Sequence, residues 1–234
     1  IYSFHMPLFM FISGYVVYKP NKNKSTNKLL SKTSYLLYPY IIWAIIDSLI
    51  YHNSVYNHVI SKVHGGLWFL LCLYEIFLLL FLLEIISTSF NKSCKFWKDI
   101  FIFGVPACIL IITNKFIYQT DIAIYLNFDM LAIHYKYFIV GYLTRKYIKL
   151  HNLFDSDIFA FISFLTFLAG LYIICNPSLQ MVNFITITIT SLSATLYIFY
   201  FFKRISIPII ISKILSFIGK RTLYIYILHS LFFY

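Results

Sequence analysis

Residues 65–86, GGLWFLLCLYEIFLLLFLLEII, decide the fold of this chain. Glu75 and Glu84 are the charged residues in this stretch, and Leu, Ile and Phe fill most other positions. A helix needs about 20 predominantly apolar residues to cross a hydrocarbon core about 30 Å thick. The stretch therefore predicts a transmembrane helix, and the other apolar runs of the chain can be compared with it.

The composition of the whole chain also favours a membrane environment. Charged residues make up 12% of the 234 residues and hydrophobic residues 61%, whereas a soluble domain usually has about a quarter charged residues. We therefore expect an all-α, polytopic transmembrane helical bundle that forms a single domain over residues 1–234. Eight spans are expected, at residues 2–18, 34–51, 65–86, 100–113, 130–143, 158–175, 184–202 and 223–234.

The net charge of +11 comes from cations in the gaps between these spans. All but three of the 19 Lys and Arg residues fall in alternate loops, and the exceptions are Lys62, Lys115 and Lys136. Lys and Arg in short loops are retained on the cytoplasmic side. The pattern thus predicts cytoplasmic basic loops with both chain ends outside. It argues against nucleic acid as a partner, because that needs cations clustered on one folded surface.

The cysteines and histidines give no sign of a metal site. The four cysteines show no Cys-x-x-Cys spacing, and three of them lie within apolar runs, where Cys behaves as a small hydrophobic residue. His52, His58 and His64 are six residues apart, which fits neither a helical pair nor a zinc knuckle. We expect neither a disulfide framework nor a bound metal.

Five segments, taken in order along the chain, resemble the acyltransferase 3 family. This is a family of membrane O-acyltransferases that modify bacterial polysaccharides and related glycans. The segments are FHMPLFMFISGY (4–15), YLLYPYIIW (35–43) after Lys28 and Lys32, LWFLLCLYE (67–75), YFIVGYLTRKY (137–147) and IGKRTLYIYILHS (218–230). The first and last segments are the most specific.

The resemblance also implies what is missing. Members are similar in having about ten spans, and the first span carries a basic residue followed about eleven positions later by a His thought essential for transfer. This chain begins after that helix and ends within the helix that carries His229. We therefore expect a fragment truncated at both ends and inactive by itself.

The function implied by the resemblance is acyl transfer in the bacterial cytoplasmic membrane. The donor would be cytoplasmic acyl-CoA, such as acetyl-CoA, and the acceptor a hydroxyl of a glycan or glycolipid, with membrane lipid around the bundle. A glycan transporter or flippase is the alternative, although no repeat relates the two halves of the chain. A degenerate remnant is the third. An upstream frame encoding the missing helix would favour the enzyme, and a stop codon the remnant.

Three residues are candidates for catalysis: His229, Glu75 and His5. Histidine can act as a base or a nucleophile near neutral pH. His229 lies about 9 to 10 Å inside the last span, where it either lines the acyl path or bonds between helices. His5 lies at the outer edge of the first span, where an interfacial residue is the simpler interpretation.

Glu75 is the most unusual of these residues. It follows Gly65 by ten positions, about 15 Å along a helix and close to the membrane midplane. An ionised carboxylate there costs about 2.5 to 3.5 kcal/mol. Either Glu75 partners His229 or the missing His, or it is a neutral group bonded to a neighbouring helix.

Lys28 and Lys32 are candidates for binding coenzyme A, with Arg145 and Lys146 as weaker ones. Lys28 and Lys32 are four residues apart, on one face if helical, and two ammonium groups can hold phosphates as point charges. The resemblance invites this assignment. The alternative is that these cations only set the topology.

Overall fold

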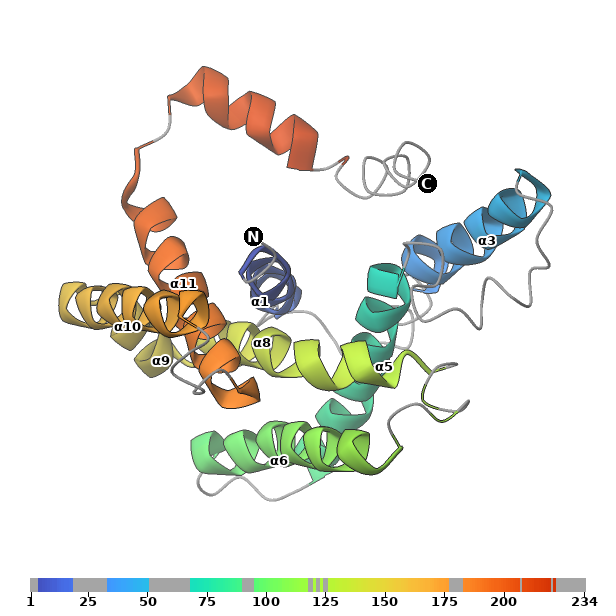
Figure 1. Ribbon diagram of the computed structural model, residues 1–234. Helices are drawn as coiled ribbons and strands as arrows, with labels where there is room; N and C mark the ends of the chain where they lie inside the picture. Colours follow the sequence, from blue (N-terminus) through green and yellow to red (C-terminus); the bar gives the residue numbers. More distant parts are fainter. Residues whose placement is uncertain are drawn as a thin grey trace. The chain divides into compact units, whose positions relative to one another are not determined.

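The computed structural model describes residues 4–18, 33–50, 68–89, 95–117, 120, 123, 126–176, 183–206, 208–219 and 221, without the side chains of 47, 50, 88, 89 and 95. All regular structure in these ranges is helical (Figure 1). The elements are α1 (His5–Val17), the π-helical turn η1 (Thr33–Leu37), α3 (Tyr38–Ile50), α5 (Trp68–Ser89), α6 (Lys95–Ile117), α8 (Phe128–Lys146), α9 (Ile148–Phe154), α10 (Asp157–Cys175) and α11 (Phe184–Arg204). A further helix, Ile209–Gly219, follows α11.

The structure confirms the predicted class of fold, that of an all-helical membrane protein. Among the described residues, four helices are long and apolar enough to cross a membrane: Trp68–Ser87, Phe96–Ile117, Asp157–Cys175 and Phe184–Arg204. Three shorter apolar helices are His5–Val17, Thr33–Ile46 and Ile209–Gly219. The count of eight spans stays a prediction, and the expected last span, 223–234, lies outside the described residues.

Helix α6 is longer than the predicted span 100–113, because it has 23 residues and begins at Lys95. Charged residues of its first turns suggested a loop, yet they are bonded to α5. The Ser87 hydroxyl donates to Oδ1 of Asp99 over 2.6 Å, and Lys98 Nζ donates to the Ser87 carbonyl over 2.8 Å. These bonds satisfy the polar groups of Lys98 and Asp99, so the helix can extend through them.

Two helices occupy stretches that were expected to be loops. They are α9, with seven residues, and Ile209–Gly219. Both are shorter than the roughly 20 residues that a span requires, so a search for spans passes over them.

The chain divides into two compact units. Unit 1 consists of Ile1–Lys22 and His134–Ile205, and unit 2 of Asn23–Ile133 and Ser206–Tyr234. Helix α8 begins in unit 2 and continues into unit 1.

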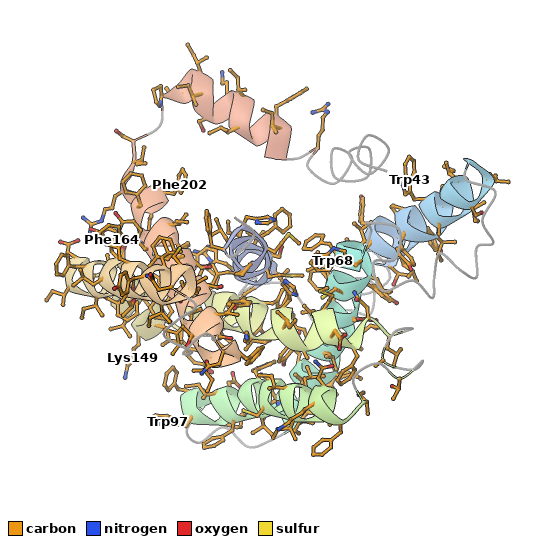
Figure 2. The ribbon with its side chains drawn as sticks, viewed as in Figure 1. Trp43, Trp68, Trp97, Lys149, Phe164 and Phe202 are labelled. Atoms are coloured by element: carbon orange, nitrogen blue, oxygen red, sulfur yellow. The ribbon has the colours of Figure 1, made fainter. Side chains whose placement is uncertain are left out.

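In unit 1, α10 and α11 pack side by side in opposite directions. The ring of Phe164, labelled in Figure 2, lies 4.9 Å from that of Tyr197. Towards the other end of the pair, a Cβ added to Gly170 would lie 2.0 Å from Oγ1 of Thr190. The residue numbers of contacting positions therefore increase along α10 as they decrease along α11.

Two glycines bring α1 and α8 into backbone contact. A Cβ added to Gly14 of α1 would lie 2.0 Å from the carbonyl oxygen of Phe138 in α8. A Cβ added to Gly141 of α8 would lie 2.0 Å from the carbonyl oxygen of Phe11 in α1. Small residues allow such close approach between membrane helices. Each glycine therefore leaves space for the other helix.

Unit 2 is built around α5, which packs against η1 and α6. The Thr33 hydroxyl of η1 donates to the Tyr74 hydroxyl of α5 over 3.4 Å. The start of α5 is bonded to the turn before α8, since Asn127 Nδ2 donates to the carbonyl of Trp68 over 3.0 Å (Trp68 is labelled in Figure 2). Asn127 has a φ of 45°, a left-handed conformation that Asn adopts more readily than most residues.

Candidate functional site

The first candidate site is a half-buried carboxylate in unit 2. Glu75 is the eighth residue of α5, about 10 Å along the axis from Trp68. Its Oε2 atom is buried and has no hydrogen-bond partner among the described residues. The buried residues Tyr40 of α3 and Cys72 of α5 lie within electrostatic range of Glu75. The site therefore combines one acidic group with a phenol and a thiol.

The helical period explains why Glu75 points inward. Residues three apart lie on the same face of a helix, and Cys72, three positions before Glu75, is fully buried. A polar group buried without a hydrogen bond is costly, and charged residues within membrane helices are candidates for function. The free lone pairs of this carboxylate can accept a proton or a hydrogen bond from a hydroxyl.

Three predicted site residues lie outside the described residues: His229, Lys28 and Lys32. The pairing of Glu75 with His229 therefore stays a prediction. His5 is described, and it is an exposed residue that begins α1 in unit 1. Its catalytic role is likewise a prediction.

The second candidate site lies in unit 1, where the basic end of α8 contacts α1. Arg145 Nη1 donates to the hydroxyl of Tyr15 over 3.1 Å, and the guanidinium carbon lies 5.1 Å from the centre of that ring. The Tyr15 ring stacks on His151 of α9 at 6.3 Å and meets Phe199 of α11 edge-on at 5.1 Å. Side chains from three other helices thus contact Tyr15 of α1.

The neighbouring cations of α11 are paired with carboxylates. Lys203 Nζ lies 2.5 Å from Oδ2 of Asp155, and Arg204 Nη2 lies 3.0 Å from Oδ1 of Asp157. The hydrogen bond from Lys203 holds the pKa of Asp155 below its ordinary value. Arg145, in contrast, has no carboxylate within ion-pair distance among the described residues. Its charge is therefore available to an anionic ligand.

Sequence reasoning did not single out Tyr15, His151 or Lys203. The basic residues at the end of α11 were interpreted as signals of topology, which gives no information about which helices meet. His151 belongs to a short helix that was not predicted. The one available signal was that Arg145 and Lys203 both fall in predicted cytoplasmic loops, which places them on the same side of the bundle.

Lys136 lies within α8, as the predicted span 130–143 implies. Its Nζ donates to the Thr188 hydroxyl over 2.6 Å and lies 3.9 Å from the centre of the Phe184 ring. A hydroxyl and an aromatic face stabilise an ammonium group at a membrane helix. Both partners come from the first turns of α11, so Lys136 has a clear role in packing α8 against that helix.

Comparison with known families favours an acyltransferase among these classes of function. The sequence model of a family described as an acyltransferase domain, the acyltransferase 3 family, matches residues 1–234. The chain belongs to this family. The resemblance expected from five segments is therefore confirmed, and the protein is a membrane acyltransferase at the level of the family. No curated protein and no solved structure matches the chain.

Membership in the acyltransferase family gives both candidate sites a chemical setting. Acyl transfer needs a group that takes the proton of the attacking hydroxyl and a binding site for the donor. Glu75, with its buried Oε2 atom, is suited to take the proton of the hydroxyl. Arg145 is a cation suited to bind the donor. In the described ranges no group of three or more His, Cys, Asp or Glu residues is arranged to hold a metal ion.

Proposed function

We propose that this protein transfers an acetyl or similar acyl group from cytoplasmic acyl-CoA to a hydroxyl of a cell-surface glycan or glycolipid. The observation that carries the proposal is the match of the acyltransferase family to the whole chain. The proposed location is the bacterial cytoplasmic membrane, with the basic loops facing the cytoplasm, where acyl-CoA is available.

The reaction breaks one bond and forms another of similar type. The acceptor oxygen attacks the thioester carbonyl, and its proton passes to a base. The carbon–sulfur bond of the thioester then breaks, and the thiolate of coenzyme A takes up a proton. The products are an O-acyl ester and free coenzyme A, so the step needs neither an oxidant nor a metal.

The proposed base is Glu75, acting directly or through a histidine. Its Oε2 atom has no hydrogen-bond partner among the described residues, which supports this assignment, because an acidic group that only held helices together would have its own hydrogen bonds. His229 is the proposed histidine within the chain, and His5 is a second candidate at the start of α1.

The proposed donor site is at the cytoplasmic end of unit 1. Arg145 supports it, because its guanidinium contacts only the neutral Tyr15 among the described residues and keeps donors for a phosphate. Lys28 and Lys32, which lie outside the described residues, are proposed separately to bind the phosphates of coenzyme A.

The test of Glu75 compares two glutamates of one helix. Membranes that contain the complete protein receive acetyl-CoA labelled in the acetyl group, and the label in the glycan and glycolipid fractions is measured. Glu75→Gln is expected to lower the initial rate by at least about 100-fold, as for loss of a general base. Glu84→Gln, the same change nine positions further along α5, should keep the rate of the unmodified protein. Full activity in both variants would exclude Glu75 as the base.

A second comparison tests the expected inactivity of the chain itself. Residues 1–234 and the complete reading frame are each expressed in a strain without the gene, and mass analysis then measures acyl groups on surface glycans. Acylation is expected only with the complete reading frame. Acylation by residues 1–234 alone would refute the proposed inactivity of this stretch.

A further inference from the structure

The helix Ile209–Gly219 has one apolar face and one polar face. At 100° per residue, six apolar residues cover an arc of about 160°. They are Ile210, Ile211, Ile214, Leu215, Phe217 and Ile218. Ser212, Lys213, Ser216 and Gly219 occupy the opposite side. Ile209, in the first turn, is the one apolar residue on that side.

The apolar face is exposed in the structure. The six apolar side chains have between 46% and 74% of their surface accessible. Exposed apolar patches of this kind mark surfaces that contact a partner or a membrane.

The described part of this helix carries a charge within its apolar sequence. Lys213 lies near the middle of the eleven residues Ile209–Gly219, which extend about 16 Å. Pro208 precedes them, with its carbonyl accepting the amide of Ser212 over 2.9 Å. A helix with a charged polar face and an apolar face suits the membrane surface.

Chain connectivity gives the surface to which the helix belongs. Five peptide steps separate Arg204, the last residue of α11, from Ile209, and they extend at most about 18 Å. This is less than the thickness of the hydrocarbon core, so the helix begins on the side of the membrane at which α11 ends.

The charges near this helix favour lipids with anionic headgroups. Residues 203–221 contain Lys and Arg but no Asp or Glu. Lys203 and Arg204 are paired with carboxylates of unit 1. Lys213 projects from the polar face, and the Arg221 guanidinium lies 3.7 Å from the centre of the Phe217 ring, at the edge of the apolar face. Cations at this level of a membrane attract anionic headgroups.

We propose that the helix Ile209–Gly219 lies in the plane of the membrane surface at which α11 ends. Its apolar face then inserts among the acyl chains, and Lys213 and Arg221 bind the headgroups of anionic phospholipids. This inference concerns the lipid contact of the chain and does not depend on the proposed acyl transfer.

The first test measures which side of the helix faces lipid. Spin labels are attached to single cysteines in the complete protein, reconstituted in vesicles of phosphatidylethanolamine and phosphatidylglycerol. Labels from Ile211→Cys and Ile214→Cys should collide mainly with oxygen, which concentrates in lipid. Labels from Ser212→Cys and Ser216→Cys should collide mainly with a water-soluble nickel chelate.

Three results would overturn the orientation. Protection of Ile211→Cys and Ile214→Cys from both reagents would show that a protein surface covers the apolar face. Access of the nickel chelate to all four labels would place the helix in water. Access of oxygen alone to all four would place it inside the bilayer.

The second test concerns the anionic headgroups. In phosphatidylcholine vesicles, the Ile214→Cys label should be shallower than in vesicles with phosphatidylglycerol. The double variant Lys213→Gln, Arg221→Gln should abolish this difference between the lipids. Lys149→Gln, a change at an exposed lysine of α9 (Figure 2), should preserve it. Equal depth of the unmodified helix in both lipids would refute the binding of anionic headgroups.

Discussion

Asp99, which is buried, and Glu75, which is half-buried with one buried oxygen, differ in their hydrogen bonding. Asp99 of α6 is fully buried and accepts a short hydrogen bond from Ser87. This bond between α5 and α6 offsets the cost of burying the carboxylate. Glu75 has a buried oxygen without such a bond among the described residues. This difference at the level of single atoms makes Glu75 the stronger candidate for chemistry.

The ion pair of Asp155 predicts a pH dependence of stability. Its pKa is lowered by the hydrogen bond from Lys203, so the folded state binds the proton less readily than the unfolded chain. The stabilisation is therefore complete above the ordinary pKa of Asp, about 3.9, and is lost as the pH falls through the lowered folded-state pKa. Asp155→Asn should lower the melting temperature at neutral pH, and the difference should disappear in acid.

The size of this effect is limited by solvent. The side chains of Lys203 and Asp155 are 37% and 29% exposed, so the pair contributes at most about 1 kcal/mol. Thermal unfolding of the protein in detergent, followed by circular dichroism across the pH range, measures it. Lys149→Gln serves as the control without a melting shift. A difference for Asp155→Asn that is the same in acid and at neutral pH would contradict the ion-pair explanation.

Arg145 yields a prediction about binding of the donor. Replacing it by Gln removes the guanidinium charge, and a hydrogen bond to a charged group contributes about 1.5 to 3 kcal/mol. The KM for acyl-CoA should rise by roughly 10- to 100-fold while kcat changes little, because binding is weakened and the reacting atoms are untouched. Initial rates at varied acyl-CoA concentration give both constants.

The same kinetics include a control that the structure provides. Lys149→Gln also removes a positive charge from this region of the sequence, at an exposed position of α9. It should leave the KM for acyl-CoA unchanged. Equal rises in KM for Lys149→Gln and Arg145→Gln would mean that only the overall charge matters, and would remove Arg145 from the donor site.

At the level of elements, the crossing of α1 and α8 predicts intolerance to a single methyl group. A Cβ at Gly14 would lie 2.0 Å from a backbone oxygen of α8, so the two helices would have to separate. Gly14→Ala should destabilise the protein by about 1 to 3 kcal/mol, the usual cost of overpacking. Thermal unfolding in detergent measures the loss.

Gly104 provides the matched control for this change. It lies within α6, and no atom is found within 4 Å of its added Cβ. Gly104→Ala should leave stability unchanged or raise it by up to about 1 kcal/mol, because Ala favours the helix. A loss at Gly104 as large as that at Gly14 would show that the helix crossing is not the cause.

At the level of the whole molecule, the alternating basic loops predict the topology. Alkaline phosphatase, which is active only outside the cytoplasm, can be fused after residues 62, 92, 119 and 149. Fusions after 62 and 119 should be active and fusions after 92 and 149 inactive, because Lys and Arg retain their loops inside. Enzyme activity in whole cells, corrected for the amount of fusion protein, is the measurement. Equal activity after 62 and 92 would mean that α5 does not cross the membrane.

The sequence by itself determined the class of fold, the family and most helix positions. Apolar runs long enough to span a bilayer are a local property, which is why α10 (Asp157–Cys175) and α11 (Phe184–Arg204) lie within two residues of their predicted spans. The family was recognisable for a related reason, because its motifs are contiguous in the sequence. Prediction from apolar runs failed where charged residues lie inside helices, as at the start of α6.

Only the tertiary structure decided which residues meet. The contact of Tyr15 with Arg145 joins positions 130 residues apart, and the glycines of α1 and α8 are explained only by each other. The sequence identified Glu75 as a charge in an apolar run, but the absence of a described partner for its Oε2 emerged only from the surrounding atoms. Hydropathy shows which segments leave water, whereas packing and hydrogen bonding between distant segments determine which of their polar groups remain available.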